Sequence, residues 1–221
     1  RFTCSRPGTV QNPSYSYMLP QPAGLPVLTS TVNPAVRAPV EVLTQFGKVE
    51  LLWREMVQHG ALCSRYQHHS WMAGWWDHIG CMSQDSPHVT VLRDDTGTPV
   101  LLLPLVRKKV GPLQAGFFMG GKHTNFNLPV WRPGHLKQPT AALNALVEGL
   151  RHNGPRLDLL VLLNQPAAWQ GMANPMLQAP HREAASRAYT GELQSDFEAL
   201  LKERMGANSR KKLRQKERQL A

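Results

Sequence analysis

The sequence predicts an α/β (α+β) fold in which a central, mostly antiparallel sheet is flanked by helices. β-rich segments recur between residues 88 and 119, helical apolar periodicity lies on both sides of them, and a stretch that is apolar except for Asp158 follows at 157–163. With 221 residues, 42% of them hydrophobic, the chain is long enough to bury a sizeable core.

Residues 1–40 are expected to form a disordered leader. Seven of the eighteen prolines fall there, and charge is sparse. Such a stretch cannot bury enough apolar surface to offset the entropy lost on ordering. The first folded domain is therefore expected to begin near residue 41.

Two helices are predicted next. Residues 42–58 place apolar side chains at intervals of three and four, and Gly60 is a plausible terminator. A second helix should cover residues 70–79, with one face formed by Trp71, Trp75 and Ile79. Core packing explains these tryptophans, and a ligand-stacking platform is the alternative.

Three antiparallel strands should follow, and they are the centre of the predicted domain. The turn residues at 94–99 separate the first two strands, with a glycine free to take positive φ. Pro104 lies inside the second strand, 100–106, and lacks an N–H, so we expect a sheet edge or a bulge there. The third strand, 113–119, leads into Gly120-Gly121 and a polar loop at 122–127.

The rest of the first domain, 41–186, should contain one helix and one strand. Thr140 is a credible N-cap for a helix at 141–151. The apolar stretch 157–163 has the pattern of a strand buried on both faces. Residues 164–186 read as a loop.

Residues 187–221 are expected to open a second, truncated domain. A strand at 187–193 would precede a helix with Ser195 at its N-cap and Glu198 three positions on, the capping-box spacing. That helix should break near Gly206 and resume as a basic helix. The helical pattern continues to the last residue and the chain begins with Arg, so a fragment is expected.

Charge and cysteine usage narrow the functional classes. The formal charge is +10, but residues 202–218 hold eight basic and two acidic side chains, giving +6 there and +4 elsewhere. This distribution does not favour a nucleic-acid-binding protein as a whole. Three scattered cysteines and no apolar run of membrane-spanning length favour a cytoplasmic protein. The spacing of His68, His69, His78 and Cys81 predicts no metal site.

Four motifs resemble a known family. They are Gln67-x-x-x-Trp71-x-x-x-Trp75, Leu102-Leu103-Pro104-Leu105, the stretch 120–129 (GGKHTNFNLP) and the basic stretch 209–218. In this order they resemble the tandem-GNAT acyltransferases of the CelD/BcsL type, acetyltransferase-like proteins of cellulose biosynthesis. Thr124-Asn125 stands where Ser-Asp is usual in that family. The resemblance covers about residues 45–221, the N-terminal half of such a protein and the start of its second GNAT-like domain.

The resemblance implies an enzyme that moves an acyl group from acetyl-CoA or another acyl-CoA to an amine or hydroxyl acceptor, such as a saccharide, in polysaccharide or cell-envelope metabolism. In related tandem enzymes the acyl-CoA site belongs mainly to the second half. This chain shows no Gly-rich pyrophosphate loop before its 141–151 helix. Alone, it is therefore expected to be inactive and to need the missing C-terminal GNAT half as its partner.

The candidate site residues lie in the loop at 122–127. His123 is the best candidate for a catalytic base because an imidazole exchanges protons near neutral pH. Asn125 and Asn127 could bind a polar acceptor together with His123, and substrate contact is favoured over catalysis for all three. Turn formation is the alternative for each. The alternative function is a non-enzymatic module whose basic helix engages nucleic acid or an acidic surface.

Overall fold

The structure, a computed structural model, describes residues 40–83, 85–136, 138–184 and 195–220. Apart from Val40, the predicted leader lies outside these ranges, and so does the predicted strand at 187–193. The chain divides into two compact units, Arg1–Glu183 and Ala184–Ala221. No helix in the described ranges is both long enough and apolar enough to cross a lipid bilayer.

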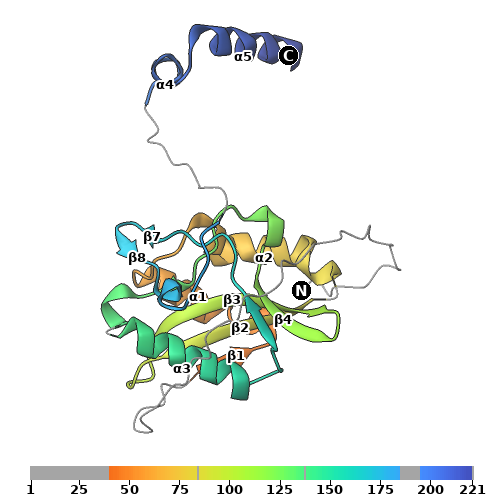
Figure 1. Ribbon diagram of the computed structural model, residues 1–221, viewed down its shortest axis with the longest axis vertical. Helices are drawn as coiled ribbons and strands as arrows, with labels where there is room; N and C mark the ends of the chain where they lie inside the picture. The colour runs from red at the N-terminus through yellow and green to blue at the C-terminus, as the bar shows by residue number, and fades with distance from the viewer. Residues whose placement is uncertain (1–39, 84, 137, 185–194, 221) are drawn as a thin grey trace. The chain divides into compact units, whose positions relative to one another are not determined.

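A six-stranded mixed sheet forms the centre of the first unit (Figure 1). Its hydrogen-bonded order is β1 (Val40–Leu43), β2 (Ser86–Arg93), β3 (Pro99–Val110), β4 (Leu113–Phe118) and β6 (Leu159–Val161), with β5 (Val130–Trp131) also paired to β3. Among the described strands of this sheet, only β4 and β6 pair in parallel. The prediction of a mostly antiparallel sheet flanked by helices is confirmed.

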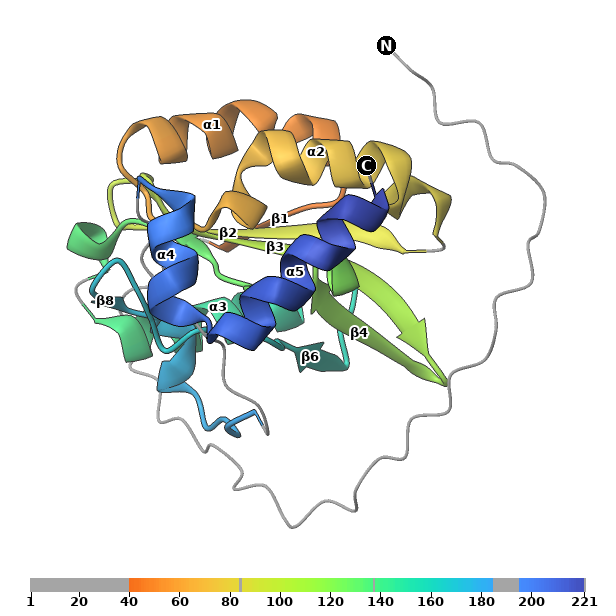
Figure 2. The same cartoon turned by 90° about the horizontal axis from the view of Figure 1, so that it is seen from above.

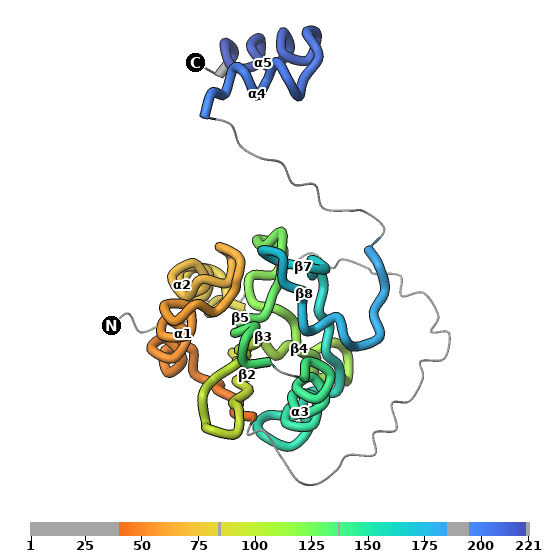
Figure 3. The backbone as a smooth tube through the Cα atoms, turned by 90° about the vertical axis from the view of Figure 1, so that its left-hand side faces the viewer, coloured from red at the N-terminus to blue at the C-terminus, as the bar shows by residue number. Residues whose placement is uncertain are grey.

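Helices cover both faces of this sheet. α1 (Glu50–Gln58) and α2 (His69–His78) run beside each other over one face, and α3 (Pro139–His152) covers the other (Figures 2 and 3). Successive side chains of β2 point to opposite faces of the sheet, so this strand contributes to the packing on both faces. Val89 and Val91 pack with α1 and α2, whereas Leu92 packs with α3. Two hydrophobic cores result, one on each face.

The predicted hairpin between β2 and β3 is confirmed. Asp94 Oδ1 accepts hydrogen bonds from the backbone N–H groups of Thr96 (3.0 Å) and Thr98 (2.9 Å). The Thr96 hydroxyl also donates to Asp94 Oδ1, at 2.6 Å. This hydrogen bond is the largest cause of the lowered pKa of Asp94, and the two backbone bonds lower that pKa further. Gly97 has a φ of 83°, a conformation in which a side chain would be strained.

The first predicted helix is wrong at its start. Residues 40–43 form β1, and a 3₁₀ turn at Phe46–Lys48 precedes α1. The β-branched Val40 and Val42 pair with Leu92 and Thr90 of β2, a long-range interaction that overrides the helical periodicity.

The buried face of α2 also differs from the prediction. Met72 and His69 are its buried side chains, while Trp71 and Trp75 are only partly buried and Ile79 is 40% exposed. Ile79 lies at the C-cap, beyond the helical residues, so it cannot continue the stripe. Partial burial of Trp71 and Trp75 leaves both of the alternatives for these side chains open.

Pro104 lies in a central strand, so the expected edge or bulge is wrong. Its carbonyl accepts a hydrogen bond from the Met119 N–H at 2.9 Å, beyond the end of β4. On that side β3 pairs with β5 through residues 101–102 and with β4 through residues 105–110. Pro104 therefore falls in the interval between two partners, where a ladder donor is not needed.

The end of the first unit shows three further differences. α3 begins at Pro139, with Gln138 rather than Thr140 at its N-cap, because proline is pre-organised for the first helical position. The strand predicted to be buried on both faces shortens to β6, at the sheet edge, where Leu159 is 46% exposed. The predicted loop at 164–186 contains a small hairpin of β7 (Ala168–Trp169) and β8 (Met172–Ala173).

α3 packs unusually closely against β1. A Cβ atom built on Gly149 would come within 2.3 Å of Val40 Cβ, so only glycine allows this approach. One turn later, Asn153 Nδ2 donates a hydrogen bond to the Val40 carbonyl at 2.7 Å. The C-terminal end of α3 is thereby fixed to the edge strand.

The second unit contains α4 (Phe197–Arg204) and α5 (Ala207–Leu220), and the predicted break near Gly206 is confirmed. The N-cap of α4 is Asp196 rather than Ser195, and its carboxylate accepts from the Glu198 N–H. Arg214 of α5 donates to the Glu198 carboxylate of α4 at 2.7 Å.

Candidate functional site

The parallel pairing of β4 and β6 defines the edge at which the predicted site lies. Three residue pairs form this ladder, ending with Phe117 opposite Val161. Both strands therefore end at the same edge of the sheet, and ligands of open α/β sheets commonly bind beyond the carboxyl ends of strands. The loop 120–127 follows β4 at this edge.

Gly120 sets the path of this loop. Its φ of 92° is left-handed, and a Cβ atom added there would lie 2.4 Å from Thr124 Cγ2 and 3.2 Å from the Trp71 ring. Only glycine satisfies both conditions. The chain then turns through a 3₁₀ turn at Gly121–His123, which brings Thr124 back over Gly120.

Thr124 and Asn127 attach the loop to the end of β6. The Thr124 hydroxyl lies 3.0 Å from the Gly121 carbonyl and 2.8 Å from Asn127 Oδ1. Asn127 Nδ2 donates to the Leu163 carbonyl at 3.0 Å, and the Asn127 N–H donates to the Asn164 carbonyl at 2.9 Å. Both Thr124 and Asn127 are buried. These bonds close the loop on itself and against the segment after β6.

Gln67 attaches the same loop to the helical layer. Its fully buried side chain donates from Nε2 to the Phe126 carbonyl at 3.0 Å and accepts from the Ser64 hydroxyl at 2.6 Å. Its own carbonyl accepts from Trp53 Nε1 at 2.9 Å. We call Ser64, Gln67, Thr124 and Asn127 the loop network. Every side chain in it has a hydrogen-bond partner, so it stabilises the loop.

The three predicted site residues have different environments. His123 and Asn125 are exposed, with Lys122 beside them, and are free to meet a ligand. Asn127 is 4% exposed, and both ends of its amide are bonded within the loop network. Its geometry favours the turn-forming alternative over substrate binding. The structure thus leaves His123 and Asn125 exposed on the loop and buries Asn127.

Partly buried aromatic rings lie beside the loop. Phe126 and Trp169 have ring centroids 5.9 Å apart, and Tyr66 meets Trp71 edge-on at 5.5 Å. Trp169 Nε1 donates to the Cys63 carbonyl at 3.1 Å. Burial raises the pKa of the Cys63 thiol to about 11, so this cysteine is not a nucleophile at neutral pH.

The described part of the chain holds no group of three or more His, Cys, Asp or Glu side chains placed to bind a metal ion. Of the histidines considered from the sequence, His69 is buried and His78 is exposed. His69 instead lines a separate hollow on the helical side of the unit, together with Glu50. Apolar periodicity within a single helix could not predict this hollow, because His69 and Glu50 belong to two different helices that meet only in the folded chain.

Comparisons with known proteins give no further constraint. No family model, no curated protein and no solved structure matches the chain.

Proposed function

We propose that the first unit is the N-terminal half of a GNAT-type acyltransferase that uses acyl-CoA to modify an amine or hydroxyl acceptor. The observation that supports this most is the parallel pairing of β4 and β6 across α3, after two helices and an antiparallel meander. This is the element order that the resemblance implies. A saccharide acceptor, in polysaccharide or cell-envelope metabolism, suits the exposed histidine and amide at this edge.

In this proposal the acceptor's amine or hydroxyl attacks the acyl-CoA thioester, and a general base accepts its proton. His123 and Asn125 are the exposed polar side chains that would contact the acceptor. His123 is the best candidate for the base because imidazole exchanges protons near neutral pH. Asn127 and Gln67 would act indirectly, by holding the backbone that carries these two residues.

The first unit is proposed to leave acyl-CoA binding to the missing second half. Phosphate cradles use consecutive backbone N–H groups at a helix N-terminus, and α3 instead begins with Pro139, which has no N–H. Calorimetric titration of the 221-residue chain with acetyl-CoA should therefore give weak binding that falls further with added salt. Tight binding that is insensitive to salt would contradict this division.

The acceptor role is tested in the protein that carries both halves. His123→Ala and Asn125→Ala should lower acyl transfer from acetyl-CoA while leaving the melting temperature nearly unchanged, because both side chains are exposed. Asn144→Ala, at an exposed position of α3, is the matched control and should retain full activity. Unchanged turnover in both loop variants would sink the proposed role of this edge.

A non-enzymatic role for α5 is the second candidate, favoured by its many exposed basic side chains. Two arginines already have partners inside the second unit, because Arg210 donates to the Met205 carbonyl and Arg214 to Glu198. A salt-sensitive gel shift of the chain with nucleic acid, lost on Lys211→Gln with Lys212→Gln, would favour this role over the enzymatic one.

A further inference from the structure

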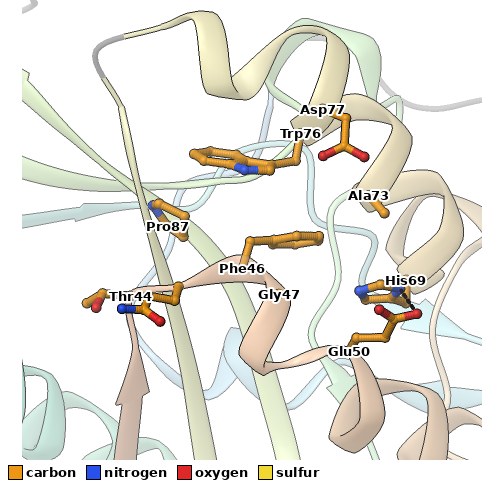
Figure 4. Close-up of a pocket in the computed structure, with 10 residues that line it drawn as sticks. Thr44, Phe46, Gly47, Glu50, His69, Ala73, Trp76, Asp77 and Pro87 are labelled. Carbon is orange, nitrogen blue, oxygen red and sulfur yellow. Dashed lines mark ion pairs between the residues drawn. The ribbon is translucent and has the colours of Figure 1, made fainter. Parts of the chain in front are cut away.

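A hollow of about 410 Å³ lies on the helical side of the first unit (Figure 4). Its walls come from the 3₁₀ turn at Phe46–Lys48, the first turn of α1, one side of α2 and the start of β2. This volume is in the range of pockets that hold small organic molecules. None of the loop-network residues lines the hollow, so it is distinct from the edge that carries His123.

One wall is a stack of three rings. The Phe46 ring lies between Trp76, at a centroid distance of 6.0 Å and an interplanar angle of 24°, and His69, at 5.3 Å and 12°. Figure 4 shows these rings side by side along the hollow. Ala73, whose side chain is small, also lines it and leaves room for a ligand. An apolar body of a ligand can therefore pack against aromatic surface.

His69 supplies an unused polar group at the end of this wall. Its side chain is 5% exposed, and neither ring nitrogen has a hydrogen-bond partner. The nearest carboxylate oxygen, Glu50 Oε1, lies 3.9 Å from Nδ1, beyond hydrogen-bond distance. Burial lowers the pKa of His69 more than Glu50 raises it. The ring is therefore neutral at neutral pH, with one donor and one acceptor, and buried polar atoms without partners are rare in proteins.

The lining of the hollow carries negative charge. Glu50 and Asp77 line it, and none of the lining residues is Lys or Arg. Arg54 pairs with Glu50 at 2.8 Å from the next turn of α1, and both side chains are about half exposed, so the pairing only partly offsets the Glu50 charge. Asp77 is exposed.

We propose that this hollow binds a small primary amine with a flat apolar body. The ammonium group would lie beside Glu50 and donate to the unprotonated nitrogen of His69, and Asp77, beside Trp76, would add to the negative charge of the lining. The apolar body would lie against the part of the Phe46 and Trp76 rings that lines the hollow. Carboxylate ligands are disfavoured because they would meet two like charges. This site is independent of the acyl-transfer proposal and stands if that proposal fails.

The ligand chemistry is tested with three probes of one shape, titrated into the 221-residue chain by NMR. The probes are 2-phenylethylamine, 2-phenylethanol and 3-phenylpropanoate, and the signals followed are the Trp76 indole N–H and the His69 ring. The amine should shift both signals saturably, the alcohol should bind roughly tenfold more weakly, and the acid should not bind, because charge-assisted hydrogen bonds are stronger than neutral ones. Equal binding of amine and alcohol, or no saturable shift with the amine, would overturn the proposal.

Substitutions inside and outside the hollow test whether 2-phenylethylamine binds there. Ala73→Leu keeps all charges but narrows the hollow, so amine binding should weaken. Glu50→Gln and Asp77→Asn should each weaken it about two- to fivefold, the effect expected of partly exposed charges. Glu55→Gln, an exposed position on α1 outside the hollow, is the control and should bind as the parent does. Circular dichroism checks folding. Should Ala73→Leu misfold, the two charge variants decide, and binding unchanged in both would place the amine elsewhere.

Discussion

Two polar regions meet at the start of α2, and they differ in how their buried groups are satisfied. Gln67 and His69 are two residues apart in sequence, and their side chains are 0% and 5% exposed. Gln67 belongs to the loop network and bonds Ser64 and Phe126. His69 faces the hollow, and neither of its ring nitrogens has a hydrogen bond.

This difference separates a structural polar group from a candidate binding group. A bonded buried amide stabilises the fold, and its removal leaves its partners unsatisfied. An unbonded buried imidazole carries a desolvation cost that an isosteric apolar ring does not have. The largest effects on stability are therefore expected in the loop network, and the largest effects on ligand binding in the hollow.

Gln67→Ala should give the largest loss, roughly 3 kcal/mol of unfolding free energy, because it leaves the Ser64 O–H donor and the Phe126 carbonyl without their partner and opens a small cavity. Urea denaturation measures the loss. Gln58→Ala, at the exposed end of α1, is the matched control. A loss of unfolding free energy in Gln67→Ala no larger than that in Gln58→Ala would show that the hydrogen bonds of Gln67 do not stabilise the fold.

His88 extends the comparison to the other face of the sheet. It is fully buried in β2, on the same face as Leu92, and both of its ring nitrogens lack partners. Burial, with a smaller contribution from Arg107, lowers its pKa from 6.5 to about 4. Below pH 6.5 the unfolded chain binds the proton more readily, so stability should be constant above that pH and fall between about 6.5 and 4.

The fall attributable to His88 should approach about 3 kcal/mol near pH 4, by the free-energy value of a pKa shift of this size. His88→Leu should flatten that part of the curve, measured by urea denaturation from pH 4 to 8. Because the ring has no hydrogen bonds to lose, stability at pH 8 should be maintained. An unaltered pH dependence in the variant would show that His88 is not the group responsible.

Asn127→Ala and Asn125→Ala compare two asparagines of one loop. Asn127→Ala should cost about 2 kcal/mol, because it removes the bonds to Thr124 and Leu163 from a buried site. Asn125→Ala should change stability by no more than about 0.5 kcal/mol, as expected for an exposed side chain. Thermal melts of both variants suffice, and equal losses would mean that burial does not distinguish these positions.

His69→Phe should have only a small effect on stability. It keeps a flat ring stacked on Phe46 and removes two unsatisfied nitrogens, so the unfolding free energy should change by less than about 1 kcal/mol. The same variant should lose much of its affinity for 2-phenylethylamine. A loss of stability in His69→Phe as large as that in Gln67→Ala would show that His69 stabilises the fold and is not a binding group.

The sequence predicted most of the architecture because that part depends on local patterns. The hairpin before β3, α2, α3 and the break before α5 all follow from turn residues or apolar periodicity. β1 did not, because a four-residue strand is defined by its partner β2 and not by its own sequence.

The site was less predictable than the fold. Sequence placed His123, Asn125 and Asn127 in one polar loop, but burial alone distinguishes the third from the other two. The role of Gln67 depends on Phe126, 59 residues away. The hollow forms from the 3₁₀ turn, α1, α2 and β2, whose assembly is a tertiary property.

The close packing of α3 on β1 has a consequence for the order of folding. β1 precedes its strand partner β2 by the two helices, and the Asn153 amide that bonds Val40 comes 113 residues later. A contact between residues so far apart in sequence forms only after a long loop has closed, and the entropy lost in closing that loop slows folding. On the ribosome Val40–Leu43 emerges long before Asn153, so the contact between this edge strand and the end of α3 forms only after α3 has been synthesised.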